Sequence, residues 1–380
     1  MTAYPAAMIV AVCKEPLFES RVSLLPETAA ALVKKNISVW IESDAGAKAS
    51  CSNQDYLQAG CQIGTRDNII VRSQVILTLQ YQDIPSNLGT KVLIGIYQPL
   101  YQIQLIEKWA KQQLTVFSLD MLPRTTRAQS MDVLSSQASI AGYKAVLLAA
   151  NLFQRYFPML MTAAGTIPPA RVLILGAGVA GLQAIATAKR LGAMVEVFDT
   201  RPAVKEEVMS LGAKFIEVEG AANADAAGGY AVEQQEDFLI KQKAKIADSL
   251  AKADILITTA QIPGKQAPVL VTLAMLESMK KGSVVVDLAA ATGGNTELTQ
   301  NDKTVIHQGV TIVGNSSLAA SLPYDASKLY GKNVSNFLQL ITGSDHALNL
   351  NFEDDIVKGC CIVHGGEIIN PRVKAQVAAG

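Results

Sequence analysis

The sequence predicts an α/β protein with two domains, each built on a mainly parallel sheet and joined to the other by long helices. Its 380 residues are about two and a half times the usual domain length, so two domains can each bury a core. Short β-rich segments alternate with helical ones over residues 8–120, and a second alternation of the same kind runs from 171 to 314. Strands separated by helices of this length require crossover connections, which produce parallel sheets.

The first domain is predicted from the alternation in the amino-terminal part of the chain. Strands are expected at 8–13, 38–43, 75–80, 91–97 and 114–120, and helices at 27–36 and 102–113. The stretch from Arg127 to Phe153 is rich in Ala, Leu, Ser and Gln, with no proline and one glycine, which predicts a long helix between the domains. The TIPPA segment at 166–170 ends any helix before the next strand.

The second domain is predicted from a longer series of the same kind. Strands are expected at 171–175, 194–199, 213–218, 254–260, 283–289 and 310–314. A helix from about Pro323 carries the chain out of the second domain. The last forty residues are too short a segment to fold alone, so we place them on the first domain. We therefore expect a discontinuous first domain of residues 1–137 and 323–380, and a second domain of residues 138–322.

The charge balance excludes one class of function. The chain has 33 Lys and Arg against 33 Asp and Glu, so it lacks the basic field with which a nucleic-acid-binding protein collects phosphates. The first ten residues show no secretory signal, and the longest uncharged runs are broken by glycines and polar side chains. The five cysteines form no CxxC pair, which indicates unpaired thiols in a reducing cytosol and no metal site.

A glycine fingerprint opens the second domain. A GxGxxG pattern alone is a weak signal, but here it follows an apolar strand at 171–175 and opens an amphipathic helix, and Asp199 ends the next strand 23 residues after Gly176. The glycines allow a tight turn, close approach of a pyrophosphate and close packing of helix and strand, while the helix N-terminus attracts the phosphates. A Rossmann-like domain is therefore expected, with the cofactor at Gly176, Gly178, Val179, Ala180 and Gly181.

Asp199 favours NAD(H) over NADP(H). Its carboxylate can accept hydrogen bonds from both hydroxyls of an adenosine ribose and would repel a 2′-phosphate. Arg201 complicates this prediction because an arginine there could receive a 2′-phosphate; we expect it to lie over the adenine or the pyrophosphate instead. The alternative is a Rossmann-like sheet that binds another nucleotide, or none.

Proton donors for a dehydrogenase are hard to find in the sequence. His307, His346 and His364 lie outside the expected site and are predicted to be structural or surface residues. The strands at 75–80 and 91–97 are followed by YQDIP and QPLYQ, which contain neither Lys nor His. No general acid is therefore expected at the ends of these middle strands of the first domain.

The segment 124–137, RTTRAQSMDVLSSQ, carries a polar face. On a helix that begins near Arg127, the side chains of Gln129, Asp132, Ser135 and Ser136 would share one face in an otherwise apolar stretch. Such a face can hold the carboxamide and ribose of a nicotinamide by hydrogen bonds. The alternative is a helix capped by Thr126 with a solvated face.

Five blocks carry a resemblance to a known family: 123–146, 176–215, 236–242, 257–272 and 282–295. Together, PRTTRAQSMDVLSSQASIAGYKAV, GAGVAGLQAIATAKRLGAMVEVFDTRPAVKEEVMSLGAKF, EDFLIKQ, ITTAQIPGKQAPVLVT and GSVVVDLAAATGGN resemble the soluble NAD(H)-binding component of proton-translocating NAD(P) transhydrogenase, the first domain of its alpha subunit. That family shares its fold with alanine dehydrogenase, and the motif KEP…RVSLLPET at 14–28 is common to both.

The resemblance implies roles for individual residues. Gln129 is implied to lie at the nicotinamide and to reach toward the partner that carries NADP(H), Asp199 to hold the adenosine ribose, and Tyr230 to close a mobile loop over the nucleotide; a surface tyrosine is the alternative for Tyr230. The implied catalytic set is Arg124, Gln129, Asp132 and Ser135, and Thr200, Arg201 and Ala260 complete the cofactor-binding set.

The same resemblance implies an activity and partners. Hydride would pass between NADH on this chain and NADP⁺ on a beta subunit, with no base needed because no proton moves at the redox atoms. A membrane-spanning subunit would translocate protons, and the chain would form a homodimer, cytoplasmic but peripheral on the inner membrane through its partners. A soluble NAD-dependent alanine dehydrogenase is one alternative, which the missing Lys and His of the first domain disfavour. A non-catalytic NAD(H) sensor is the other.

Overall fold

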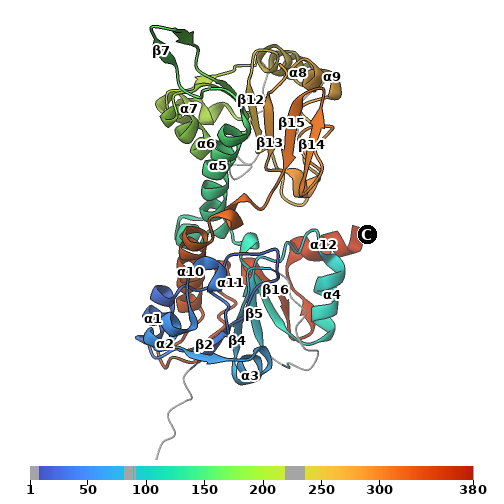
Figure 1. The fold of residues 1–380 in the computed structure, drawn as a ribbon. Helices are drawn as coiled ribbons and strands as arrows, with labels where there is room; N and C mark the ends of the chain where they lie inside the picture. The colour runs from blue at the N-terminus through green and yellow to red at the C-terminus, as the bar shows by residue number, and fades with distance from the viewer. Residues whose placement is uncertain (1–7, 81–88, 90, 219–235, 380) are drawn as a thin grey trace, which may run out of the picture. The chain divides into compact units, whose positions relative to one another are not determined.

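The computed structural model describes residues 8–80, 89, 91–218 and 236–379 (Figure 1). The chain divides into two compact units, the first of residues 1–137 and 320–380 and the second of residues 138–319. The sequence placed the two boundaries at 137/138 and 322/323. Both units are mixed α/β with mainly parallel sheets, which confirms the predicted fold class.

The first unit is built on a sheet with the strand order β17-β16-β6-β5-β4-β1-β2-β3. Neighbours from β3 to β6 pair in parallel, whereas β16 is antiparallel to β6 and β17 to β16. The central strands are apolar along their whole length because helices cover both faces of a parallel sheet. The strands are β1 (Ile9–Val12), β2 (Ser38–Glu42), β3 (Gln62–Gly64), β4 (Val75–Leu77), β5 (Val92–Gly95), β6 (Thr115–Ser118), β16 (Cys361–His364) and β17 (Glu367–Ile368).

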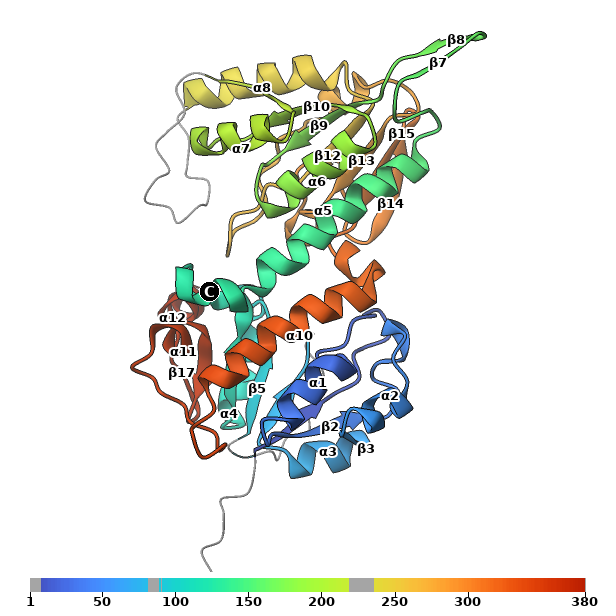
Figure 2. The ribbon, with the colours of Figure 1, turned by 90° about the vertical axis from the view of Figure 1, so that its left-hand side faces the viewer.

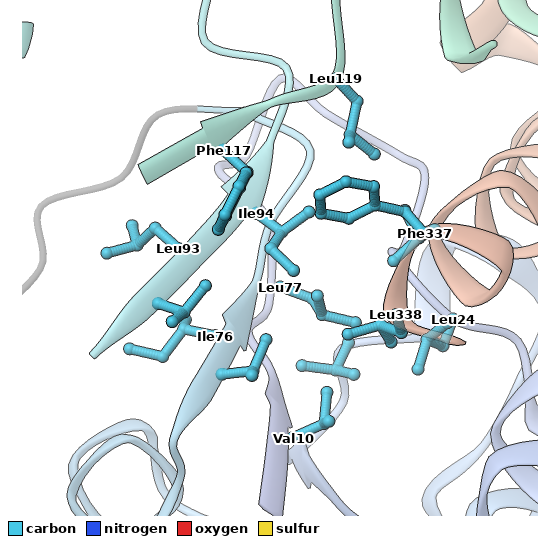
Figure 3. Packing of buried hydrophobic residues seen from close by; sticks show 14 of the residues in the cluster. Val10, Leu24, Ile76, Leu77, Leu93, Ile94, Phe117, Leu119, Phe337 and Leu338 are labelled. Carbon is cyan, nitrogen blue, oxygen red and sulfur yellow. The ribbon is translucent and has the colours of Figure 1, made fainter. Parts of the chain in front are cut away.

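Helix α10 (Pro323–Leu340) packs a complete apolar stripe onto this sheet. The stripe follows the helical period through Tyr330, Val334 and Phe337, all fully buried. Phe337 reaches toward Ile94 and lies 5.2 Å from Phe117 between ring centroids (Figure 3). The remaining helices of the unit are α1 (Pro26–Val33), α2 (Asn53–Gln58), α3 (Arg66–Arg72), α4 (Ile103–Lys111), α11 (Asp355–Cys360) and α12 (Pro371–Ala379).

The second unit has the strand order β11-β10-β9-β12-β13-β15-β14. The chain runs outward from β9 through β10 to β11 and then returns to β12 on the other side of β9. The carboxyl ends of β9 and β12 therefore form a topological switch point, where open α/β sheets bind ligands. The strands are β9 (Arg171–Leu175), β10 (Met194–Phe198), β11 (Lys214–Phe215), β12 (Ile255–Thr258), β13 (Val284–Asp287), β14 (Lys303–His307) and β15 (Val310–Gly314), and the helices are α6 (Val179–Arg190), α7 (Lys205–Ser210), α8 (Glu236–Leu250) and α9 (Leu273–Glu277).

Two features of this unit are absent from the sequence prediction. Strand β14 pairs antiparallel with β15 at the edge of the sheet, and its residues are mostly exposed, so it lacks the apolar run of a buried strand. A hairpin of β7 (Leu160–Thr162) and β8 (Gly165–Ile167) extends from the unit (Figure 2). The TIPPA segment thus continues from a hairpin strand and does not follow a helix directly.

Helix α5 (Val133–Leu152) crosses the boundary between the units. In the part of the chain that the structure describes, it alone is long and apolar enough to span a membrane by length and composition. Its residues Ala145, Val146 and Ala149 are buried in the core of the second unit, as in the core helix of a folded domain.

A buried ion pair holds the loop after β1 in the first unit. Arg21 donates from Nε and Nη2 to the Glu19 carboxylate at 2.8 and 2.7 Å, and from Nη1 to Gln137 Oε1 at 2.7 Å. Gln137 in turn donates to the carbonyl of Ala326 at 3.0 Å. Burial alone would raise the pKa of Glu19, but the hydrogen bonds and charge of Arg21 outweigh it and hold that pKa below its usual 4.5.

Replacing Arg21 with Met should destabilise the protein by about 3–5 kcal/mol, because the Glu19 carboxylate is left buried without a cation. Lys328→Met is the matched control: it breaks an exposed pair with Glu27, which solvent screens, and should leave the free energy of unfolding nearly unchanged. Denaturant titration measures both, and equal effects would contradict the prediction. The pKa of Glu19 is lower in the folded state than in the unfolded state. Its contribution to the free energy of unfolding is therefore complete above about pH 4.5 and is lost as the pH falls through the folded-state pKa.

Candidate functional site

The glycine loop joins β9 to α6 at the switch point of the second unit. Gly176 has a φ of +101°, and a Cβ on it would lie 2.5 Å from Thr259 Oγ1. A Cβ on Gly181 would lie 1.9 Å from the carbonyl oxygen of Gly176. At Gly178, no described atom beyond its two chain neighbours lies within 4 Å of a Cβ position. Packing therefore explains the first and third glycines, whereas the space at Gly178 fits a ligand that approaches the backbone.

The amino end of α6 is open to an anion. Gly178 is the N-cap residue and has no side chain, and no described side chain makes a capping hydrogen bond there. The first-turn N–H groups, which include those of Val179 and Ala180, have no partners within the helix and carry the positive end of its dipole. This arrangement can hold a pyrophosphate.

Asp199 lies against the glycine loop with its carboxylate fully engaged. Oδ2 accepts from the N–H of Ala177 at 2.7 Å and from Arg201 Nη2 at 2.7 Å, while Oδ1 accepts from the N–H and Nε of Arg201 at 2.9 Å each. Four hydrogen bonds occupy the lone-pair sites of a carboxylate. A ligand with two hydroxyl groups could therefore bind this carboxylate only after the side chain of Arg201 had left it. Thr200 is half-buried between the two residues.

Ala260 is held at the end of β12 by an asparagine that the sequence prediction omits. Its N–H donates to Asn295 Oδ1 at 3.0 Å, and Asn295 Nδ2 donates back to its carbonyl at 2.8 Å. The backbone N–H of Asn295 donates to Asp287 at 2.6 Å, and both residues are fully buried. The segment DLAAATGGN after a buried strand was the available signal, because polar residues at the end of such a strand are often functional.

Gly142 of α5 is a second residue that the sequence prediction omits. A Cβ at this position would lie 2.0 Å from the carbonyl oxygen of Ala180, so any larger residue would push α5 away from the amino end of α6. The signal was the single glycine in the stretch 127–153, since a glycine within a helix weakens it and usually has a packing reason.

The expected helix from Arg127 is wrong in its first turns. Residues Thr126–Met131 form a 3₁₀ helix, the chain is extended at Asp132 with a ψ of 92°, and α5 begins only at Val133. Asp132 accepts from the N–H of Ser135 at 2.9 Å and from its Oγ at 2.6 Å. Its carboxylate thus caps α5, a role that the sequence alternative gave to Thr126.

The structure accordingly brings some of the predicted nicotinamide residues together and separates others. Asp132 and Ser135 are in direct contact, and Gln129 is joined to Asp132 through its carbonyl, which accepts from the Asp132 N–H at 3.3 Å. Gln129 and Arg124 are both exposed, Gln129 on the 3₁₀ turn and Arg124 before it. Ser136 lies in the first turn of α5 and donates to the carbonyl of Val133 at 3.1 Å. A single helical face through Gln129 and Ser136 does not exist.

The histidines occupy structural or surface positions. His307 lies on the edge strand β14, 3.0 Å from Glu277, and His364 lies 3.0 Å from Thr115 Oγ1. His346 sits in a turn with a φ of +62°. Tyr230 and its loop fall outside the described residues.

All five cysteines are free and buried. Burial raises the pKa of the Cys61 thiol to about 11 and that of Cys361 to about 12, so these thiols are weak nucleophiles. Within the described ranges, no group of three or more His, Cys, Asp or Glu residues could hold a metal ion.

Two family models match the chain over most of its length. The N-terminal domain of "Alanine dehydrogenase/PNT" matches residues 11–141, and the C-terminal domain matches residues 145–371.

Among curated relatives, the chain is 44% identical to the first part of the NAD(P) transhydrogenase alpha subunit of Rhodospirillum rubrum, covering 95% of this chain and 97% of that protein. It is 42% identical to NAD(P) transhydrogenase subunit alpha of Haemophilus influenzae, covering 98% of this chain and 73% of that protein.

Among solved structures, the transhydrogenase from Sinorhizobium meliloti matches with a TM-score of 0.86 at 44% identity, over 95% of this chain and all of that one. An L-alanine dehydrogenase matches with a TM-score of 0.80 at 24% identity, over 98% of this chain and 99% of that one, which shows a shared fold alone. The identities separate the two branches clearly, and the chain belongs to the alanine dehydrogenase/PNT family, on the branch of the NAD(P) transhydrogenase alpha subunits.

Proposed function

We propose that this chain is the NAD(H)-binding component of a proton-translocating NAD(P) transhydrogenase, of the Si-specific/Re-specific type. The observation that carries the proposal is the open position at Gly178, beside a helix end without a side-chain cap, in a chain 44% identical to a transhydrogenase alpha subunit. When bound, NADH supplies the hydride for NADP⁺ on a partner subunit.

The second unit supplies the cofactor contacts in this proposal. The backbone at Gly178, Val179 and Ala180 holds the pyrophosphate by N–H groups and the helix dipole. Asp199 accepts from the adenosine ribose once Arg201 has moved away. The other cofactor-binding residues are Gly176, Gly181, Thr200, Ala260 and, in the loop outside the described residues, Tyr230.

The first unit supplies the nicotinamide contacts. Asp132 and Ser135 already form one hydrogen-bonded pair, and Gln129 and Arg124 are exposed. Because hydride transfer between two nicotinamides moves no proton at the redox atoms, these residues need only orient the ring and exclude water. This requirement agrees with the segments YQDIP and QPLYQ, which follow the two middle strands of the first unit and contain neither Lys nor His.

The relatives are alpha subunits of a transhydrogenase, so partner subunits follow from the family. We infer an NADP-binding beta subunit, a membrane-spanning subunit and a homodimer of this chain. The chain would then be cytoplasmic and peripheral on the inner membrane.

The first prediction of this proposal concerns turnover. Gln129→Asn should slow hydride transfer to NADP⁺ on the partner subunit by about tenfold or more, because a shorter side chain misplaces the ring. The dissociation constant for NADH should change less than about twofold, since the adenosine and pyrophosphate contacts are intact. Stopped-flow transfer with nicotinamide analogues and equilibrium titration measure the two quantities. Gln58→Asn, on the exposed surface of α2, is the control; equal behaviour of both variants would show that Gln129 is an ordinary surface residue.

The second prediction concerns cofactor choice. The unmodified chain should bind NADH much more tightly than NADPH. Asp199→Ala should weaken the binding of NADH by about tenfold to a hundredfold and so reduce the difference between the two affinities. Arg201→Gln should increase the difference between the affinities for NADH and NADPH, because it frees the Asp199 carboxylate for the ribose hydroxyls and removes a cation that could receive a 2′-phosphate. Lys214→Gln, which breaks an exposed pair with Glu196 in the same unit, should leave the ratio unchanged. Equal affinities of the unmodified chain for the two cofactors would refute the role of Asp199.

The third prediction separates the transhydrogenase from an amino-acid dehydrogenase. The isolated chain should form negligible NADH from NAD⁺ and alanine, because imine reduction and its reverse need a positioned proton donor. It should transfer hydride rapidly once the NADP-binding partner is added. Robust alanine oxidation by the chain alone, abolished by Gly178→Leu, would favour the alternative. Tight NADH binding without either activity would favour a sensor.

A further inference from the structure

The 3₁₀ turn that carries Gln129 is poorly held by its own backbone. Six-residue 3₁₀ helices are uncommon because their hydrogen-bond geometry is unfavourable. Ala128 and Met131 are buried, whereas Gln129 between them is exposed. A turn of this kind needs support from outside if it is to hold an exposed side chain in one place.

Two amides of α10 provide that support at one carbonyl. Asn333 Nδ2 and Asn336 Nδ2 each donate to the carbonyl oxygen of Ser130 at 2.9 Å. The two asparagines lie three residues apart and so share one face of the helix. Both lone pairs of the Ser130 oxygen, in the residue directly after Gln129, are therefore occupied.

The buried side chain of Asn333 lowers the stability of the first unit. Its side chain is buried, and its Oδ1 has no hydrogen-bond partner among the described residues. A buried polar atom without a partner lowers stability. An apolar residue would avoid that cost, so the amide at position 333 is explained by the one bond that it donates, to Ser130.

A second anchor lies on the other side of Gln129. Arg127 forms a bidentate pair with Asp354, at 2.6 and 2.8 Å, and also contacts Asp355. Asp354 is fixed in turn, because it caps α11 by accepting from the N–H of Ile356 at 2.9 Å. Gln129 is thus placed between a turn residue bound to α11 and one bound to α10.

We propose that Asn333 and Asn336 are positioning residues, which fix the turn Thr126–Met131 so that Gln129 is presented to the nicotinamide in one orientation. The proposal rests on the proposed function of Gln129. Neither asparagine contacts the reacting atoms; each acts through the Ser130 carbonyl, and Arg127 with Asp354 completes the clamp. A site that is held in place before the cofactor arrives loses less rate to misalignment.

The test is hydride transfer from NADH on this chain to NADP⁺ on its partner subunit. Asn333→Asp and Asn336→Asp keep the size of each side chain but replace the N–H donor with an oxygen. The double variant should slow transfer by about tenfold to a hundredfold, with the dissociation constant for NADH within about twofold of the unmodified value. Asn336→Ala, at a half-buried position, tests the same bond if the buried Asn333→Asp variant fails to fold.

Gln339→Ala is the matched control, because this α10 amide is exposed and donates to Ser335 within its own helix, away from Ser130. It should leave transfer unchanged.

A double-mutant cycle tests the positioning role of the asparagines separately from the proposed role of Gln129. If the asparagines act through Gln129, Asn336→Asp should cause no further loss of rate in a Gln129→Ala background. If Asn336→Asp lowered the transfer rate equally with Gln129 or Ala at position 129, or lowered it in neither case, the positioning role would be overturned. The proposed role of Gln129 itself would still stand. Unchanged transfer in Gln129→Ala alone would instead overturn the proposed site.

Discussion

The second unit depends on the convergence of three backbone segments at the amino end of α6. Gly142 brings α5 against Ala180, Gly181 brings α6 against the glycine loop, and Gly176 makes room for Thr259 at the end of β12. None of these approaches tolerates a Cβ. Because the backbones of α5, α6 and the loops after β9 and β12 approach so closely here, they define where the first-turn N–H groups of α6 lie beside the open position at Gly178.

The sequence predicted those parts of this site whose residues lie close together along the chain. The strand at 171–175, the glycine loop and Asp199 lie within 29 residues, and their hydrophobic period and spacing are enough to place them. Asn295 and Gly142 each stand out in the sequence, but they meet Ala260 and Ala180 only after folding, so the sequence could not show which residues they contact. The helix predicted from Arg127 was wrong because the Asp132 side chain bonds to Ser135 and starts the helix later, a competition that periodicity does not register. The edge strand β14 and the hairpin β7–β8 were missed because exposed strands lack an apolar run.

The chain uses the same short motif, a carboxylate two residues before an arginine, for opposite purposes. Glu19 and Arg21 are 2% and 8% exposed and are joined to Gln137, so this pair is a permanent part of the first unit. Asp199 and Arg201 lie at the mouth of the glycine loop, with Arg201 18% exposed. In the proposed function, the guanidinium of the second pair would leave Asp199 and the adenosine ribose would take its place.

The burial of every cysteine has a practical consequence. All five thiols are buried, and burial raises the pKa of the Cys13 thiol to about 12, so the native chain presents no reactive thiolate to an electrophile in the folded state. If one cysteine were introduced on each unit, these two residues would therefore be the sites of maleimide attachment, and no native cysteine would need to be removed. Fluorophore pairs attached in this way would report the distance between the units in solution, and its change during turnover.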